Sequence, residues 1–362
     1  MNIAFVNATI RWGGVKTWTL DFGESLRDKG HAVFIYGRQP EFIEAARRRV
    51  GHGERMNFGA DLNPLTIRRF CRIFRENAID VVIVNIEKDL ATAGAAARLL
   101  GIPTVQRIGL PTDIPHRLKT RLLHAWIRPR FLCPCRYIAE GFLRLLPYVR
   151  ENDVRVVLNG KKPVASDAAC RLHAPRRFVC TQQLSHDKGH AVLLRAFAEL
   201  RARRPDLDFE VHVHGTGKEE AALKTLCSRL NLDDRVVWRG FSSSVQDTLP
   251  ENDIFLLASL SEGLPNTLLE GMAAGLLPIC RDVGGVREVL SPGLDPWVLP
   301  FDADEHAFCA AMTAALDLSD DALLDLRQEA RAQRNCFDLE SRADELAAWL
   351  GTLTDKARKE NA

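Results

Sequence analysis

Short apolar runs rich in β-branched residues alternate with amphipathic stretches along most of this 362-residue chain. Such continuous runs are typical of parallel strands that helices cover on both faces. One series precedes residue 160 and a second series follows it. The expected strands are residues 2–7, 31–36, 80–85 and 103–108, then 177–181, 209–214, 236–239, 254–258 and 277–281. The pattern predicts an α/β chain with two Rossmann-like domains.

The length of the chain also favours two domains, because a single core rarely grows to this size. Residues 158–177 contain Gly, Pro and polar residues without periodicity, and we expect the interdomain linker there. The predicted first domain is residues 1–160, joined by a C-terminal helix at about 340–362. The predicted second domain is residues 161–339. Ligands of such sheets bind at the carboxyl ends of strands, so we expect the domains to face each other across a ligand-binding cleft.

Composition restricts the setting of the protein. Hydrophobic residues make up 46% of the chain and charged residues 27%, as in ordinary soluble proteins. There is no apolar run of membrane-spanning length, and the first residues lack the pattern of a secretory signal. The nine cysteines are scattered and odd in number, which argues against a disulfide framework. We expect a cytoplasmic protein, with the inner face of the cytoplasmic membrane as a possible location.

The charge is unevenly distributed, although the net charge is only +2. Residues 1–160 carry 25 Lys and Arg against 15 Asp and Glu, whereas residues 161–362 carry 24 against 32. A basic half could face anionic lipid, a phosphorylated acceptor or nucleic acid, or could simply be solvated. Residues 115–136 are basic with Leu, Trp and Phe interspersed, which is compatible with peripheral contact with an anionic membrane. The alternative is a cleft-lining helix pair with a basic outer face. No nucleic-acid-binding module is recognisable, so we expect no nucleic-acid partner.

Residues 253–288 form the densest cluster of polar residues and glycines. The strand expected at 254–258 ends shortly before Glu262 and Gly263, and Pro265 suits the first turn of a following helix. The start of such a helix favours anions, since its N–H groups lack intrahelical partners. The N–H groups expected to face a ligand belong to Asn266, Thr267 and Leu268.

Glu262 lies just before this helix and Glu270 about one turn inside it. A phosphate could lie on the helix end while the two carboxylates accept hydrogen bonds from sugar hydroxyls. Two glutamates on the surface of a capped amphipathic helix would produce the same spacing, so the surrounding sequence has to decide between these interpretations.

The segment SEGLPNTLLEGMAAGLLPICRDVGGVREV resembles the donor-site signature of the glycosyltransferase family 4 enzymes. QLSHDKG is similar to the phosphate-loop segment of that family, and VHGTGKEE to its Gly-x-Gly strand end. LNGKK resembles its interdomain strand, and GGVKTWTLDFGESL its glycine loop and first helix. The resemblance implies a GT-B fold and a retaining, metal-independent transfer from a nucleotide sugar, UDP- or GDP-sugar being favoured. It implies no cofactor and no metal ion.

The resemblance also implies residue roles. Glu262 would contact the donor sugar hydroxyls, Glu270 would hold the ribose, and Lys188 would neutralise the diphosphate. The first glycine loop would approach the diphosphate, and residues 239–241 would border the base. The expected donor-binding residues are Gly13, Gly14, Gln183, Lys188, Gly215, Arg239, Phe241, Glu262, Gly263, Leu264, Asn266, Thr267, Leu268 and Glu270. The expected catalytic residues are Glu262, Lys188 and Arg107.

This sequence departs from the family pattern at two positions. Gln183 stands where an arginine is usual, and Gly109 where many members have a histidine near the reacting sugar. Arg107 could substitute in part, or could be an ordinary strand-end arginine. Residues 85–89, NIEKD, follow a strand and could meet the acceptor.

We therefore expect a retaining glycosyltransferase that transfers a sugar to a glycan or lipid-linked acceptor in the biosynthesis of lipopolysaccharide, capsule or exopolysaccharide. The alternatives are a non-catalytic nucleotide-sugar-binding relative and a GT-B-shaped sugar-nucleotide epimerase. Two short Asp-x-Asp patterns, at 206–208 and 302–304, lie in expected turns, where they do not suggest a metal site.

Overall fold

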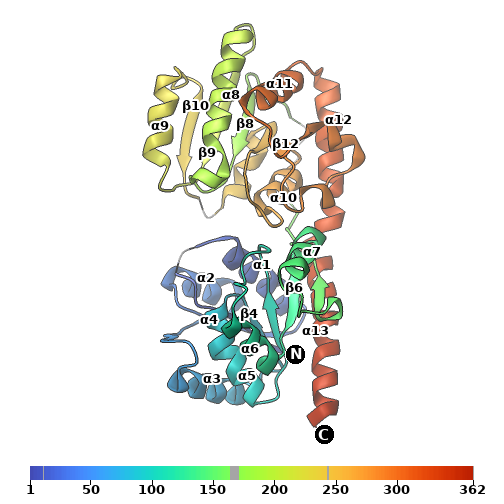
Figure 1. Cartoon of the computed structure of the whole chain (residues 1–362). Coiled ribbons are helices and arrows are strands. Elements are labelled where there is room, and N and C mark those ends of the chain that lie inside the picture. Colours follow the sequence, from blue (N-terminus) through green and yellow to red (C-terminus); the bar gives the residue numbers. More distant parts are fainter. Residues whose placement is uncertain (11, 164–170, 243, 362) are drawn as a thin grey trace. The chain divides into compact units, whose positions relative to one another are not determined.

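The computed structural model describes residues 1–10, 12–163, 171–242 and 244–361. The chain divides into two compact units, the first formed by residues 1–160 with 339–362 and the second by residues 161–338. Each unit has one parallel β-sheet with helices packed against it (Figure 1). Of the expected linker, residues 164–170 lie outside the described residues.

The sheet of the first unit has the strand order β3-β2-β1-β4-β5-β6-β7, with all neighbours parallel. The strands are β1 (Asn2–Asn7), β2 (Ala32–Gly37), β3 (Glu54–Arg55), β4 (Val81–Val84), β5 (Thr104–Arg107), β6 (Arg130–Cys133) and β7 (Val154–Val156). The chain builds outward from β1 to β3 and then returns to β4. The strand order therefore reverses between β1 and β4, and such reversals are where open α/β sheets bind ligands.

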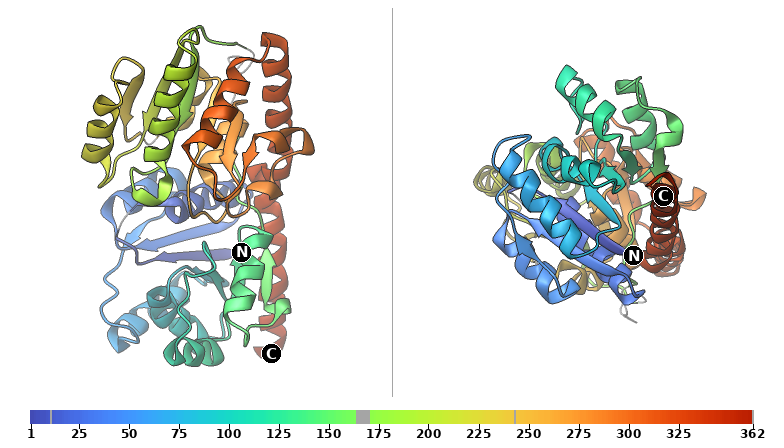
Figure 2. Two further views of the ribbon diagram at one scale, coloured as in Figure 1. Left: turned by 45° about the horizontal axis from the view of Figure 1, so that its top comes forward. Right: turned by 90° about the horizontal axis from the view of Figure 1, so that it is seen from below.

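Helices cover both faces of this sheet. They are α1 (Gly14–Asp28), α2 (Pro40–Val50), α3 (Pro64–Glu76), α4 (Glu87–Asp89), a π-helical turn η1 (Leu90–Gly94), α5 (Ala95–Leu99), α6 (Leu118–Ile127), α7 (Arg136–Leu145), η2 (Glu151–Asp153) and α13 (Leu339–Asn361). Helix α13 runs beside the first unit (Figure 1, Figure 2). Its buried residues recur every three or four positions, at Leu339, Ala343, Leu346 and Leu350, and join the core around α1. This apolar stripe explains why the end of the chain belongs to the first unit.

The sheet of the second unit has the order β10-β9-β8-β11-β12-β13, again with parallel neighbours. Its strands are β8 (Arg176–Cys180), β9 (Phe209–His214), β10 (Val236–Gly240), β11 (Ile254–Leu257), β12 (Leu277–Arg281) and β13 (Val298–Leu299). Its helices are η4 (His186–Lys188), α8 (His190–Arg203), α9 (Glu220–Arg229), η5 (Val245–Asp247), η6 (Leu249–Glu251), α10 (Asn266–Ala273), η7 (Val286–Glu288), η8 (Pro292–Trp297), α11 (Glu305–Leu316), α12 (Asp320–Ala332) and η9 (Gln333–Phe337). The strand order reverses between β8 and β11.

The predicted pair of Rossmann-like sheets is confirmed. Four short strands, β3, β6, β7 and β13, were not expected, and one of them corrects the interpretation of residues 115–136. That stretch is not a helix pair, because Arg130–Cys133 forms β6 between β5 and β7. The cleft between the domains stays a prediction. Among the described residues, no helix combines the length and the apolar character that crossing a membrane requires.

Candidate functional site

Two loops meet at the reversal point of the second sheet. One follows β8 and ends at Gly189, and the other follows β11 and leads into α10. The amide of Leu260 donates a hydrogen bond to the carbonyl oxygen of Asp187 at 2.7 Å. Gly189 has φ of +72°, and a Cβ there would lie 2.2 Å from the carbonyl oxygen of Ala258. Only a glycine allows this approach, so the close packing of the two loops depends on the glycine at position 189.

This packing brings Lys188 and Glu262 together. The Lys188 Nζ lies 2.7 Å from Glu262 Oε1 and donates to the carbonyl oxygen of Ser261 at 3.3 Å. The two side chains are 19% and 16% exposed, so they are accessible from one side and held by protein on the other. Both residues were predicted from the sequence, and the structure places them in direct contact.

A third loop fixes the peptide that carries Glu262. Gly284 has φ of +61°, and a Cβ there would lie 2.2 Å from the carbonyl oxygen of Gly263 and 2.5 Å from that of Glu262. The amide of Gly285 donates to the same Gly263 oxygen at 2.7 Å. Gly284 and Gly285 therefore pack against the loop before α10 and hold it in place. This contact explains why these two glycines occur in the cluster of residues 253–288.

The start of α10 corrects one expectation. The amide of Leu268 donates to the carbonyl oxygen of Pro265 at 3.1 Å, and the Leu268 side chain is fully buried. Its N–H group is therefore not free, because the first turn closes one residue earlier than the sequence suggested. Asn266 and Thr267 lie on the first turn and are half-buried. Gly263 and Leu264 are buried in the loop before them.

Glu270 has a partner that sequence reasoning missed. Lys161 Nζ lies 2.7 Å from Glu270 Oε1, with the side chains only 7% and 13% exposed. The backbone of Lys161 is held in turn, since its amide donates to the carbonyl oxygen of Phe337 at 2.9 Å. The ion pair fixes the orientation of the Glu270 carboxylate, whose oxygens are hydrogen-bond acceptors. The only sequence signal was the position of this lysine in LNGKK.

The remaining donor-site candidates of this unit surround the ends of β8, β9 and β10. A Cβ on Gly215, at φ of +131°, would lie 2.2 Å from the carbonyl oxygen of Gln182. Gly215 thus has a structural reason to be glycine. Gln183 is exposed beside this contact. Arg239 Nη2 lies 3.3 Å from His212 Nε2, and Phe241 is 64% exposed.

Several buried polar atoms at the same edge lack a hydrogen-bond partner among the described residues. They are Thr181 Oγ1, Ser259 Oγ, both ring nitrogens of His190 and Nδ1 of His214. Burial lowers the pKa of His190 to about 4, so its ring is neutral at physiological pH. Leaving such atoms unsatisfied is costly, and the cost is removed only when a ligand or solvent supplies the partner. These atoms surround the reversal point, and nothing in the sequence singled them out.

In the first unit, the glycine loop precedes α1. Gly13 caps this helix with extended backbone, and a Cβ there would meet nothing within 4 Å. The fold of the unit does not require a glycine at this position. A requirement for glycine there would come from a ligand that approaches the backbone closely. Gly14 is the first residue of α1.

Arg107 lies at the end of β5 and is buried in the first unit. Its guanidinium carbon lies 4.5 Å from the centre of the Trp18 ring, and Nη2 donates to Asn159 Oδ1 at 3.2 Å. Burial lowers the pKa of Arg107 to about 10. This placement favours the alternative of a strand-end arginine. The nearby Gly109 donates its amide to Asp113 Oδ2 at 2.8 Å.

Asp89 is also a correction. Residues 85–89 could have met the acceptor, but the Asp89 carboxylate is fully buried and accepts hydrogen bonds from the amides of Ala8, Asn85 and Ile86. Its role is to join the loops that follow β1 and β4. Burial raises the pKa of Asp89 to about 7.

Lys16, which the sequence analysis did not single out, lies near this carboxylate. Its Nζ donates to the carbonyl oxygen of Thr9 at 2.9 Å and to Gln39 Oε1 at 2.6 Å. Burial lowers the pKa of Lys16 to about 8, against the opposing influence of Glu41 and Asp89. The lysine therefore ties the loop after β1 to the start of α2.

Several known proteins resemble this chain in sequence. The putative colanic acid biosynthesis glycosyltransferase WcaL of Salmonella typhimurium is 28% identical over 188 residues, 49% of this chain and 46% of the relative. The amylovoran biosynthesis glycosyltransferase AmsK of Erwinia amylovora is 33% identical over 149 residues, 39% of this chain and 36% of the relative. The chain thus spans less than half the length of these two relatives. The lipopolysaccharide core biosynthesis mannosyltransferase LpsB of Rhizobium meliloti is 29% identical over 349 residues, 76% of this chain and 98% of the relative.

Solved structures resemble this chain in fold. The complex of Anabaena Alr3699/HepE with UDP is 17% identical, with a TM-score of 0.81 over 97% of this chain and 100% of that chain. A glycosyltransferase from Rickettsia africae has the same TM-score and identity, over 97% and 98%. These likenesses confirm the predicted GT-B fold.

Two family models match adjacent parts of the chain. Residues 12–163 match the model described as Glycosyltransferase Family 4, and residues 175–317 match the one described as Glycosyl transferases group 1. Together they cover every strand of the two sheets except β1, and the whole cluster from residue 253 to residue 288. The chain therefore belongs to the family 4 glycosyltransferases, the group 1 glycosyltransferases.

Proposed function

We propose that this protein transfers a sugar from a nucleotide-sugar donor to a glycan or lipid-linked acceptor in cell-envelope polysaccharide biosynthesis. The observation that carries the proposal is the contact between Lys188 and Glu262 at the reversal point of the second sheet. The names of the relatives support this class of product, since they refer to colanic acid, amylovoran and the lipopolysaccharide core. UDP is the favoured nucleotide because the solved structure of Alr3699/HepE is a complex with UDP.

The proposed mechanism follows from the charges at this point. The leaving nucleoside diphosphate gains negative charge in the transition state, and the Lys188 ammonium and the first turn of α10 would stabilise it there. Glu262 would accept hydrogen bonds from the sugar hydroxyls, and Glu270, held in place by Lys161, would accept those of the ribose. The lysine supplies the positive charge, so this scheme requires no metal ion. We propose retention of configuration on the resemblance alone.

A non-catalytic nucleotide-sugar-binding protein is the second candidate. The exposed, neutral Gln183 favours it, because an arginine at that position would have added a second cation beside the diphosphate. Such a protein would bind the donor without transferring or slowly hydrolysing the sugar. A sugar-nucleotide epimerase would instead convert the donor without any acceptor. Product analysis of the donor, with and without acceptor, separates the three functions.

A panel of UDP-, GDP- and ADP-sugars tests the donor assignment. A ligand that binds only the folded state stabilises it by about 2.7 kcal/mol at a concentration of 100 times Kd. We expect one nucleotide series to raise the midpoint of thermal unfolding by several degrees, and the matching free nucleotide to do so as well. Midpoints unchanged by every donor would refute the assignment.

We further propose that α6 rests on an anionic membrane. Leu118, Leu122 and Trp126 recur every four residues on this helix and are 72%, 60% and 42% exposed. Exposed Arg117 and Arg121 lie on the same helix or next to its start. An apolar stripe flanked by cations suits the boundary between acyl chains and acidic headgroups.

The triple variant L118S/L122S/W126S tests this contact. We expect its binding to vesicles containing phosphatidylglycerol to weaken about tenfold or more, since each apolar side chain loses its burial in lipid. The matched control is L62S/L65S/L99S, which removes three other exposed leucines from the same unit. Equal vesicle binding by the two triple variants would rule out α6 as the contact.

A further inference from the structure

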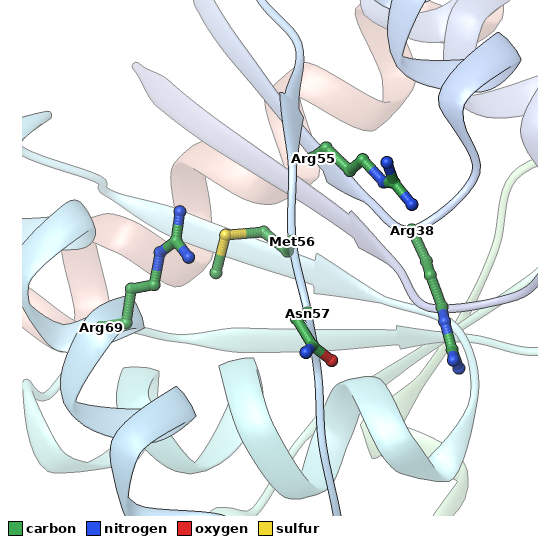
Figure 3. A pocket seen from close by; sticks show the side chains of 5 residues that line it. All are labelled: Arg38, Arg55, Met56, Asn57 and Arg69. Atoms are coloured by element: carbon green, nitrogen blue, oxygen red, sulfur yellow. The ribbon is translucent and has the colours of Figure 1, made fainter.

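A pocket of about 350 Å³ opens on the first unit, and none of its lining residues is among the expected donor-site residues. Its lining residues are Arg38, Arg55, Met56, Asn57 and Arg69 (Figure 3). Arg38 directly follows β2 and Arg55 ends β3, so the pocket lies at the carboxyl ends of the edge strand β3 and its neighbour β2. That is the edge of a parallel sheet at which ligands bind, and the volume lies within the usual range of ligand pockets.

The pocket carries more positive charge than the chain itself neutralises. Arg69 Nη2 pairs with Glu54 Oε1 at 2.7 Å. Among the described residues, no carboxylate lies within 4.0 Å of the guanidinium of Arg38 or Arg55, and both side chains are exposed. Met56 and Asn57 belong to one extended segment. In the view of Figure 3, Arg38 and Arg55 lie on one side of this segment and Arg69 lies on the other side. Three arginines thus line the pocket, and one of them pairs with a carboxylate.

The two unpaired arginines are held on a rigid base. Gly37 and Arg55 are partners in the parallel register of β2 and β3, and the amide of Met56 donates to the carbonyl oxygen of Gly37 at 2.7 Å. Met56 is 2% exposed and Phe58 is 1% exposed. Because side chains alternate along an extended segment, these two anchors leave Arg55 and Asn57 on the outer side. The backbone at Gly37 packs tightly too, since a Cβ there would lie 2.9 Å from the Phe42 ring.

We propose that this pocket binds a phosphate ester, the anionic group of a phosphorylated saccharide acceptor. The proposal rests on the proposed function, because it assigns the pocket to the acceptor of the same transfer. A guanidinium group offers N–H donors in a planar fork that matches two phosphate oxygens. Arg38 and Arg55 would supply two such forks, and the Asn57 amide a neutral donor. The pocket shares no residue with the proposed donor site.

The test uses the full chain with UDP at saturating concentration, so that the donor site is occupied. The probe is glucose 6-phosphate, compared with glucose, and binding is measured by titration calorimetry. We expect glucose 6-phosphate to bind and glucose not to bind. In the variant R38A/R55A the affinity for glucose 6-phosphate falls about tenfold or more, because charge-assisted hydrogen bonds are lost.

The matched control is R68A/R72A, which removes two exposed arginines from α3 that do not line the pocket. It lowers the net charge equally and should keep the affinity within about twofold, whereas a nonspecific charge effect would weaken both double variants alike. A second variant, R38K/R55K, keeps the charge but loses the planar fork, and we expect an intermediate affinity.

Vesicles containing phosphatidylglycerol form a second arm, which distinguishes the source of the phosphate. Loss of vesicle binding in R38A/R55A, with no measurable affinity for glucose 6-phosphate in the unaltered protein, would overturn the saccharide assignment in favour of a lipid headgroup. Equal affinity of R38A/R55A and R68A/R72A for glucose 6-phosphate would overturn the pocket as a site. Because binding of UDP is measured separately, failure of the pocket is distinguishable from failure of the donor assignment.

Discussion

The substitution Lys188→Met should lower kcat for sugar transfer about a hundredfold to a thousandfold, while the protein remains folded. Lys188 is the cation that lies 2.7 Å from Glu262 at the reversal point of the second sheet. If it stabilises charge that develops on the leaving diphosphate, its loss is felt mainly in the transition state. KM for the donor should therefore rise much less than kcat falls. Steady-state kinetics with the donor identified by thermal shift provide the measurement.

Lys224→Met is the matched control for this substitution. Lys224 also pairs with a glutamate at 2.7 Å, Glu220, but on the exposed surface of α9. Lys224→Met is also a Lys-to-Met substitution, and it removes an ion pair with the same N–O distance. Exposed ion pairs contribute at most about 1 kcal/mol to stability. We expect its kcat and unfolding midpoint to equal those of the unaltered protein. A Lys188→Met protein with normal kcat would remove this lysine from the mechanism.

The sequence predicted the strands that are long, apolar and buried. Residues 2–7 and 254–258 were recognisable because every side chain in such a strand is covered by helices, which leaves a continuous apolar run. β3 was not recognisable, since it consists of two polar residues, Glu54 and Arg55, that pair only at the edge of the sheet. β6 was hidden in a basic stretch, where flanking arginines suggested an exposed helix. The local composition therefore predicts buried strands well, but it does not predict short polar strands that pair at the edge of a sheet.

The same limit applies to the sites. Glu262 and Glu270 were predicted because their spacing belongs to one continuous loop and helix. Lys161 was missed because its contact with Glu270 joins residues more than a hundred positions apart. The burial of Arg107 likewise depends on Trp18 and Asn159, which neither periodicity nor spacing connects with it.

The largest expected effect on stability comes from a buried ion pair of the second unit. Arg327 Nη1 lies 3.0 Å from Asp253 Oδ1, and neither side chain is exposed at all. The guanidinium also donates to the carbonyl oxygens of Gly275 at 2.7 Å and Arg171 at 3.0 Å. Asp253 Oδ2 accepts from the amide of Arg177 at 2.9 Å. The pair therefore connects α12 with the residue that precedes β11. This strand leads at its other end to the loop that carries Glu262.

Arg327→Met should lower the free energy of unfolding of the second unit by about 3–5 kcal/mol, because Asp253 is left with a buried charge and no guanidinium partner. Urea unfolding followed by tryptophan fluorescence measures the change. Arg204→Met is the matched control, since it breaks the exposed pair with Asp317 at 2.9 Å and should leave the free energy of unfolding nearly unchanged. If both variants lost the same small amount, the buried pair would be dispensable. A large loss in Arg327→Met alone would show that the stability of the second unit depends on this ion pair, which lies at the opposite end of the strand that leads to Glu262.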